Sequence, residues 1–157
     1  MVTMNGNYAF ERSERVGGHP ALDFVNTVHR WDEGRPGNEY LVDYDALARW
    51  HLVSGLLDAR ALRPFGTGST AAKRRAWRQA RSLREVLYRL LAALADGRTP
   101  AQRDLDALHK ALERTLPFRR LSAAGRDIGQ RWDFAGAPPA AILGPVAWSA
   151  AELEKVR

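Results

Sequence analysis

Three short polar side chains, Asp23, Asn26 and Thr27, interrupt the apolar segment GGHPALDFVNT, residues 17–27. Their carboxylate, amide and hydroxyl groups orient hydrogen bonds well and lose little side-chain entropy when they are fixed in one position. Those properties suit a ligand site. They equally suit an architectural role, in which Asn26 and Thr27 bond to nearby backbone and hold the GGHP entry against a helix. The residue types favour the architectural role, and they indicate no reaction.

The ligand-site hypothesis adds aromatic and basic residues from the following segments. A few polar groups beside aromatic side chains are typical of small-ligand pockets, so the leading function is a non-enzymatic sensor with its pocket between the first two helices. The predicted ligand-binding residues are Asp23, Asn26, Thr27, Arg30, Trp50 and His51. An enzymatic alternative uses His29 or His51 as a general base with Asp23. It is less favoured because geometry must support such an assignment, and we predict no catalytic residue.

Metal, nucleotide and disulfide chemistry lack their usual sequence signatures. The chain has four histidines and no cysteine, and the histidines form no HxxxH or HxH pair. Thiolate ligands and disulfides are therefore excluded within this sequence, and a histidine metal site is not indicated. The GTGS segment, residues 66–69, lacks the lysine of a phosphate-binding loop. We expect no metal and no cofactor to bind these residues.

The positive charge is concentrated in one segment. The net charge is +6, and residues 60–100 contain 10 basic and 2 acidic side chains. Arg74, Arg78 and Arg81 fall on the side of an expected helix away from its leucines, where they could follow a phosphate backbone. The alternative is a solvated basic face that pairs with the acidic N-terminal third. Nucleic-acid binding through Arg74, Arg78 and Arg81 is therefore the second function hypothesis.

The elements that position these residues are mostly helices. A helix is expected from Pro20 to about Trp31, with Asp23, Asn26 and Thr27 on its polar face. A second helix begins after the cap Asp43 and ends near Gly55. The longest periodic segment runs from Ala71 to about Ala95, and another helix begins near Thr99. In that last helix one apolar stripe is predicted, formed by Leu105, Leu108, Leu112 and Leu116.

The C-terminal third departs from this helical pattern. Two short runs with aromatic residues flank a glycine-containing connection, so a β-hairpin is predicted near residues 118–134. Helix resumes afterwards, with a division at Pro145 and a capping box of Ser149 and Glu152. The predicted fold is mainly α, a single-domain orthogonal helical bundle of residues 1–157 with one small β-hairpin. Residues 1–15 are expected to be flexible.

The sequence has no signature of a membrane or secreted protein. No apolar run approaches the roughly 20 residues that a membrane-spanning helix needs. The N-terminus lacks the basic and apolar regions of a secretory signal. We expect a cytoplasmic protein of bacterial type with no membrane partner, and exposed aromatic residues leave a homodimer open.

The segments GGHPALDFVNTVHRW and YLVDYDALARWHLVSGLLD resemble the ABATE domain of bacterial CGNR zinc-finger proteins, a family linked to stress-induced transcription regulation. The family pattern of LDFVNT followed by a D-x-L and a tryptophan is matched by Asp45, Leu47 and Trp50. The resemblance continues to PVAWSAAELEKVR. It implies a mostly helical domain that senses a small molecule or mediates association.

In that family the corresponding region leads into a zinc-binding module with a CxxxxC element and a CGNR element. The present sequence ends at Arg157 and has no cysteine. The resemblance therefore implies that zinc belongs only to that module, which is absent here. DNA contact is expected chiefly in the full-length context of such a module.

Overall fold

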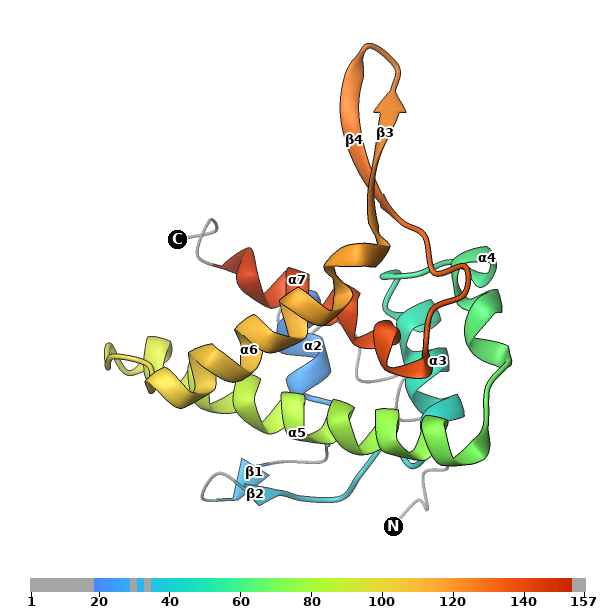
Figure 1. Cartoon of the computed structure of the whole chain (residues 1–157). Helices are drawn as coiled ribbons and strands as arrows, with labels where there is room; N and C mark the ends of the chain where they lie inside the picture. The colour runs from blue at the N-terminus through green and yellow to red at the C-terminus, as the bar shows by residue number, and fades with distance from the viewer. Residues whose placement is uncertain (1–18, 29–30, 33–34, 154–157) are drawn as a thin grey trace.

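The computed structural model describes residues 19–28, 31–32 and 35–153. Six α-helices and two small antiparallel sheets occur among these residues, so the prediction of a mainly α, single domain is confirmed. The expected flexibility of residues 1–15 lies outside the described residues. The long helix α5 (Thr70–Ala95) runs along one side of the molecule, and α2, α3, α6 and the 3₁₀ helix η3 pack against it (Figure 1).

Local signals define α5 at both ends. The side chain of Ser69 accepts a hydrogen bond of 3.1 Å from the amide of Ala72, and Gly97 follows the helix with a φ of 67°. A side-chain acceptor at the first position and a left-handed glycine after the last turn are typical helix ends. Ala76, Ala80, Leu83, Leu87 and Leu90 are buried along one side. The predicted helix from Ala71 to about Ala95 is therefore confirmed.

The first helix, α2 (Pro20–Val25), is shorter than predicted. The prediction that it continues to about Trp31 is wrong, because Thr27 turns the chain out of the helix and its carbonyl accepts from the amide of Tyr40 at 3.1 Å. Val28 then forms an isolated antiparallel bridge with Glu39. The chain continues into the two-residue strands β1 (Trp31–Asp32) and β2 (Arg35–Pro36), which pair with each other.

The second predicted helix is confirmed as α3 (Tyr44–Val53). The carboxylate of Asp43 caps it by accepting from the amide of Ala46 at 2.7 Å, and Gly55 follows with a φ of 78°. Two short elements that the sequence did not indicate connect it to α5. These are α4 (Ala59–Leu62) and the 3₁₀ helix η1 (Arg63–Gly66).

Helix α6 (Gln102–Thr115) packs along α5, but its leucine stripe is only half buried. Leu108 and Leu112 pack against the core, whereas Leu105 and Leu116 are 40% and 55% exposed. The predicted stripe therefore follows the helix without being covered along its whole length. A short 3₁₀ helix, η2 (Leu116–Phe118), leads into the next element.

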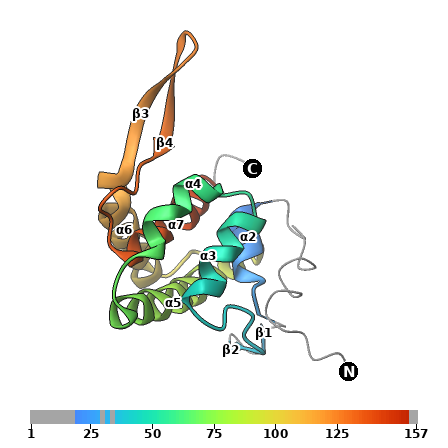
Figure 2. The ribbon, with the colours of Figure 1, turned by 90° about the vertical axis from the view of Figure 1, so that its right-hand side faces the viewer.

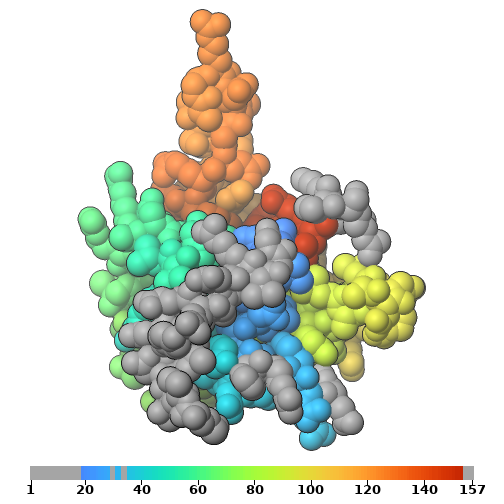
Figure 3. Space-filling model, turned by 180° about the vertical axis from the view of Figure 1, so that it is seen from behind, coloured from blue at the N-terminus to red at the C-terminus, as the bar shows by residue number. Residues whose placement is uncertain are grey.

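The predicted hairpin is confirmed by the antiparallel strands β3 (Arg119–Ala124) and β4 (Asp127–Trp132). Arg119 pairs with Trp132 at its base, and Ala124 pairs with Asp127 beside the turn. The hairpin stands away from the helices in two views at right angles (Figures 1 and 2). The space-filling view from behind shows the same projection (Figure 3).

The C-terminal helices differ from the prediction that one helix ends and another begins at Pro145. The structure has the 3₁₀ helix η3 (Pro139–Leu143) followed directly by α7 (Gly144–Ala151), so Pro145 lies in the first turn of α7. Proline is tolerated there because first-turn amides have no partner within the helix. Ser149 lies inside α7 and Glu152 caps its C-terminal end, so the predicted capping box is wrong. No helix in the described part of the chain is long and apolar enough to cross a membrane.

Candidate functional site

Thr27 is a fully buried joint between three segments. Its hydroxyl donates to the carbonyl of Phe24 at 2.6 Å and accepts from Nη1 of Arg84 at 2.9 Å. Its carbonyl receives the amide of Tyr40. These bonds hold the end of α2 against the middle of α5 and against the chain after β2. The position of Thr27 agrees with the architectural role that the residue types favour.

Arg84 and Glu39 complete this joint. The Arg84 side chain is fully buried, and its Nη1 donates to Oε1 of Glu39 at 2.7 Å while Nη2 contacts Oε2. Arg81 also lies 3.2 Å from the Glu39 carboxylate, and the amide of Leu41 donates to it at 2.8 Å. A buried guanidinium needs such compensation because an uncompensated charge is costly to bury.

Arg84 is not among the predicted site residues, although its position in the sequence carried a signal. Arg84 follows Ala80 by four residues and precedes Leu87 by three, which places it on the apolar side of α5. An arginine at such a position indicates a buried ion pair or a polar contact. Its partner Glu39 lies between the first two predicted helices, and its position carried no comparable signal.

Trp50 and His51 lie in the protein interior. The ring centroid of Trp50 is 5.2 Å from that of Phe24 and 5.0 Å from that of His51. Nδ1 of His51 lies 2.9 Å from the carbonyl oxygen of Leu47. Burial lowers the pKa of His51 to about 4, against the smaller opposing effect of the backbone carbonyls of Leu47 and Ile142. A neutral, fully buried His51 fits a packing role in the core.

The remaining predicted ligand-binding residues differ in how far they are exposed to solvent. Asp23 is buried in α2 at 7% exposure, whereas Asn26 caps the C-terminal end of α2 and is exposed. Arg30 and the alternative base His29 lie outside the described residues. The prediction of a ligand pocket formed by Asp23, Asn26, Thr27, Arg30, Trp50 and His51 stays a prediction. Of these, Thr27, Trp50 and His51 are each at most 3% exposed and already make internal contacts.

A large hollow lies elsewhere, between α5, α6 and η3. Its volume is about 710 Å³, which lies within the range of small-molecule sites. Three segments line it. Helix α5 contributes Arg78, Gln79, Ser82, Leu83 and Val86, and α6 contributes Ala107, Lys110, Ala111, Arg114 and Thr115. The chain around η3 contributes Pro138, Ala140, Ala141 and Leu143. Since successive helical residues turn by about 100°, this lining faces a different side of α5 from Arg84. We call this hollow the α5–α6 cavity.

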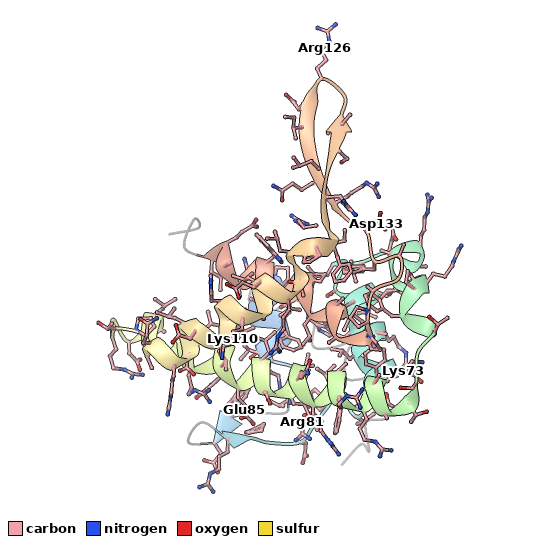
Figure 4. The ribbon with its side chains drawn as sticks, in the orientation of Figure 1. Lys73, Arg81, Glu85, Lys110, Arg126 and Asp133 are labelled. Atoms are coloured by element: carbon pink, nitrogen blue, oxygen red, sulfur yellow. The ribbon has the colours of Figure 1, made fainter. Side chains whose placement is uncertain are left out.

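The charged lining residues of the α5–α6 cavity are all cationic. They are Arg78, Lys110 and Arg114, and Figure 4 shows Lys110 on α6 where that helix passes along α5. The floor is apolar and built largely from alanines, whose small side chains leave the space open. The hydroxyl of Thr115 donates back to the carbonyl of Ala111 at 2.8 Å. This combination of an apolar floor with a cationic edge suits an organic anion.

The acidic side chains of α6 are engaged with other partners. Asp104 accepts from Nη2 of Arg89 at 2.8 Å and from its Nε at 3.0 Å. This bond to Asp104, partly offset by desolvation, raises the pKa of Arg89. Asp106 accepts from Gln102 at 2.9 Å, and Glu113 lies 2.8 Å from Nε2 of His109. The positive charge of Lys110 and Arg114 is therefore not cancelled by these acids.

A second hollow of about 380 Å³ lies between the C-terminal half of α5, α6 and the end of α7. Its lining is apolar and includes Leu87, Leu91, Leu94, Leu105 and Leu108. It lacks the few convergent polar groups that orient a small ligand. The α5–α6 cavity is therefore the stronger candidate for a small-molecule site.

The arginines predicted to contact nucleic acid have different surroundings. Arg74 and Arg78 are exposed, and Arg78 also lines the α5–α6 cavity. Arg81 stacks over the Trp77 ring at 4.8 Å and pairs with Glu39. Figure 4 shows Arg81 near Glu85 along α5. Arg81 is thus engaged in internal contacts. Binding of nucleic acid by Arg74, Arg78 and Arg81 stays a prediction.

Metal ligands do not converge in the part of the chain that the structure describes: no group of three or more histidine and carboxylate residues could hold an ion there.

Among known proteins, a family model for ABATE, described as "Putative stress-induced transcription regulator", matches residues 18–154. No curated protein and no solved structure matches the chain.

Proposed function

The chain belongs to the ABATE family, and from this premise we propose that it is a non-enzymatic sensor domain of a transcription regulator that binds a small organic anion. The observation that carries this proposal is the α5–α6 cavity, about 710 Å³ in volume, with an apolar floor and Arg78, Lys110 and Arg114 at its edge. A cavity of this size accepts a ligand of drug-like dimensions.

The chemistry of the lining selects the class of ligand. The alanines and Leu143 offer apolar contact for a hydrocarbon or aromatic group, and each buried methylene contributes about 0.8 kcal/mol. Lys110 and Arg114, one helical turn apart on α6, offer charged donors for a carboxylate, sulfonate or phosphate at one end. An amphipathic anion satisfies both parts of the lining.

Such a ligand would also connect elements that are distant in the sequence. The lining comes from α5, α6 and the chain around η3, so a bound molecule bridges α6 and η3 across α5. A ligand that binds only the folded arrangement stabilises it, by about 2.7 kcal/mol at a concentration one hundred times its dissociation constant. This coupling between ligand and packing is what a sensor domain requires.

The test is a thermal-shift titration of the whole chain with octanoate and benzoate, each compared with its neutral amide. The carboxylates are expected to raise the melting temperature and the amides to raise it less. In the variant Lys110→Gln the difference between carboxylate and amide shrinks, and in Ala107→Phe, which fills the cavity, both effects are lost.

Arg103→Gln is the matched control, because Arg103 is exposed on α6 and does not line the cavity. It is expected to bind both carboxylates as the unmodified chain does. Equal stabilisation by the carboxylates in the unmodified chain and in Ala107→Phe would contradict the cavity as the site. If Asn26→Ala abolishes binding and the cavity variants do not affect it, the ligand binds beside α2 and not in the α5–α6 cavity.

A further inference from the structure

The β3–β4 hairpin, residues 119–132, forms an arm that projects from the helical body (Figures 1 and 2). Figure 4 places Arg126 at the tip of this arm and Asp133 just beyond its base. Each strand has six residues, so the arm extends about 20 Å at roughly 3.3 Å per residue. Its residues do not line the α5–α6 cavity, so a function of the arm does not depend on the proposed ligand.

Aromatic packing fixes the base of the arm. The Trp132 ring is stacked on Phe134 with centroids 5.3 Å apart and meets the edge of Trp148 at 6.4 Å. The guanidinium of Arg119 lies 4.8 Å from the Trp132 ring, which adds a cation–π contact across the first strand pair. The arm is therefore held at a defined direction relative to the helices.

The two faces of the arm differ in character, because successive side chains of a strand point to opposite faces. One face carries Leu121, Ala123 and Ile128. Leu121 and Ile128 are 72% and 81% exposed, the highest values among the large apolar side chains of the described residues. The other face carries Arg120 directly opposite Arg131.

Both faces cost stability while they remain uncovered. Two exposed branched apolar side chains keep their surface in water, and two like charges in a directly opposed cross-strand pair repel each other. Within the described residues, no ion pair involves Arg120, Arg126 or Arg131. Residues 119–132 contain four arginines and one aspartate, a net charge of 4 − 1 = +3. These features are explained if an anionic partner covers the arm.

We propose that the β3–β4 arm binds duplex DNA, with the ribbon inserted in the major groove. Arg120, Arg131 and Arg126 pair with phosphates, while Leu121 and Ile128 contact apolar parts of the bases. The major groove is about 12 Å wide and accepts a two-stranded ribbon whose strands lie about 4.8 Å apart. The arginines predicted from the sequence to bind nucleic acid, Arg74, Arg78 and Arg81, lie on α5, so the arm is a separate surface.

Charge and shape together favour duplex DNA over other occupants. A second copy of the chain would bring two arms of charge +3 together, and their repulsion opposes such a dimer. An acidic polypeptide would satisfy the arginines without requiring a narrow projecting ribbon. The major groove of duplex RNA is too narrow and deep for such a ribbon.

The test is fluorescence anisotropy of the whole chain with a labelled DNA duplex of about 20 base pairs, two helical turns, between about 50 and 200 mM salt. Arg120→Gln/Arg131→Gln is expected to weaken binding about tenfold at the lower salt concentration. It also reduces the slope of log affinity against log salt by about 1.8, since each lost phosphate contact removes about 0.9. Ile128→Ser is expected to weaken binding with the slope unchanged.

Arg60→Gln/Arg63→Gln is the matched control, because it removes the same charge from exposed positions in α4 and η1. It is expected to change the affinity less than threefold. Circular dichroism melting of each variant checks that the fold is kept. The proposal is overturned by absence of binding at the lower salt, by equal losses in the two double variants, or by equal affinity for duplex RNA. It is also overturned if a poly-glutamate peptide competes as effectively as unlabelled DNA.

Discussion

The guanidinium of Arg84 and the carboxylate of Glu39 form a two-nitrogen ion pair inside the protein, between residues 45 positions apart in the sequence. The Arg84 side chain is fully buried, and the Glu39 side chain is 20% exposed. This pair fastens the segment after β2 to the middle of α5. It also completes the hydrogen bonding of Thr27, so the LDFVNT segment is anchored through the same guanidinium.

Removal of the Glu39 carboxylate is expected to destabilise the fold strongly. In Glu39→Ala the buried Arg84 loses its counter-ion, and such a loss costs about 3 kcal/mol of unfolding free energy when one member of a buried pair is removed. Urea denaturation at neutral pH measures this change. Glu113→Ala is the control, because Glu113 is 64% exposed and pairs with the exposed His109; its expected effect is within about 0.5 kcal/mol. Similar losses in both variants would show that the Arg84–Glu39 pair contributes no more than a surface pair.

The hydroxyl of Thr27 provides a second test of the same joint. Thr27→Val keeps the shape but removes the donor to Phe24 and the acceptor for Arg84, which is expected to cost about 1–3 kcal/mol. Thr27→Ser keeps the hydroxyl and is expected to retain most of the stability. Asn26→Ala, at the exposed neighbouring position, is the comparison by the same denaturation measurement. If Thr27→Val is as stable as the unmodified chain, the Thr27 hydroxyl does not stabilise the fold, which contradicts its architectural role.

Close packing at Gly144 is expected to exclude any side chain. A Cβ built there lies 2.8 and 2.9 Å from two ring atoms of Trp132 and 3.1 Å from Cβ of Thr115. Because the Trp132 ring is held by its neighbours, Gly144→Ala forces a shift between α7 and the base of the arm and costs about 1–3 kcal/mol. Thermal unfolding measures it against Gly66→Ala, where nothing lies within 4 Å. Equal stability of the two variants would show that α7 adjusts without cost.

The parts of the fold that depend on local signals could be predicted from the sequence. The cap at Asp43, the cap at Ser69 and the apolar periodicity of α5 are set by residues within a few positions, and each is confirmed. The end of α2 could not be predicted, because it depends on the bond from Tyr40 to the Thr27 carbonyl and on the bridge from Val28 to Glu39. The periodicity of the sequence continues past that point and contains no sign of these pairings.

The candidate site was harder to predict for the same reason. The α5–α6 cavity depends on how α6 and η3 settle against α5, and its alanines have the same sequence pattern as a tightly packed helix face. Lys110 and Arg114 are ordinary surface residues by sequence. Trp50 and His51, by contrast, suggested a pocket by their chemical type. Their burial shows that residue type alone does not distinguish a core position from a binding position.

His51 is expected to make the stability depend on pH. Burial lowers its folded-state pKa to about 4, below the unfolded value of 6.5. Above pH 6.5 the imidazole is neutral in both states, so its contribution is fully present. As the pH falls from 6.5 to 4 only the unfolded chain takes up the proton, and unfolding becomes easier by about 1.4 kcal/mol per pH unit, to a total of about 3 kcal/mol. Below pH 4 both states are protonated and this contribution no longer changes.

The measurement is urea denaturation at several pH values between 7.5 and 4, on the unmodified chain and on His51→Gln. Carboxylates also titrate over this range, but they do so in both proteins, and the difference between the two curves isolates the imidazole. The glutamine amide can still donate to the Leu47 carbonyl, so the variant is expected to fold. We expect the unmodified chain to lose about 3 kcal/mol more than His51→Gln on acidification. His109→Gln, at an exposed position, should follow the unmodified curve. Parallel curves for the unmodified chain and His51→Gln would mean that the buried imidazole accepts a proton without opening the fold.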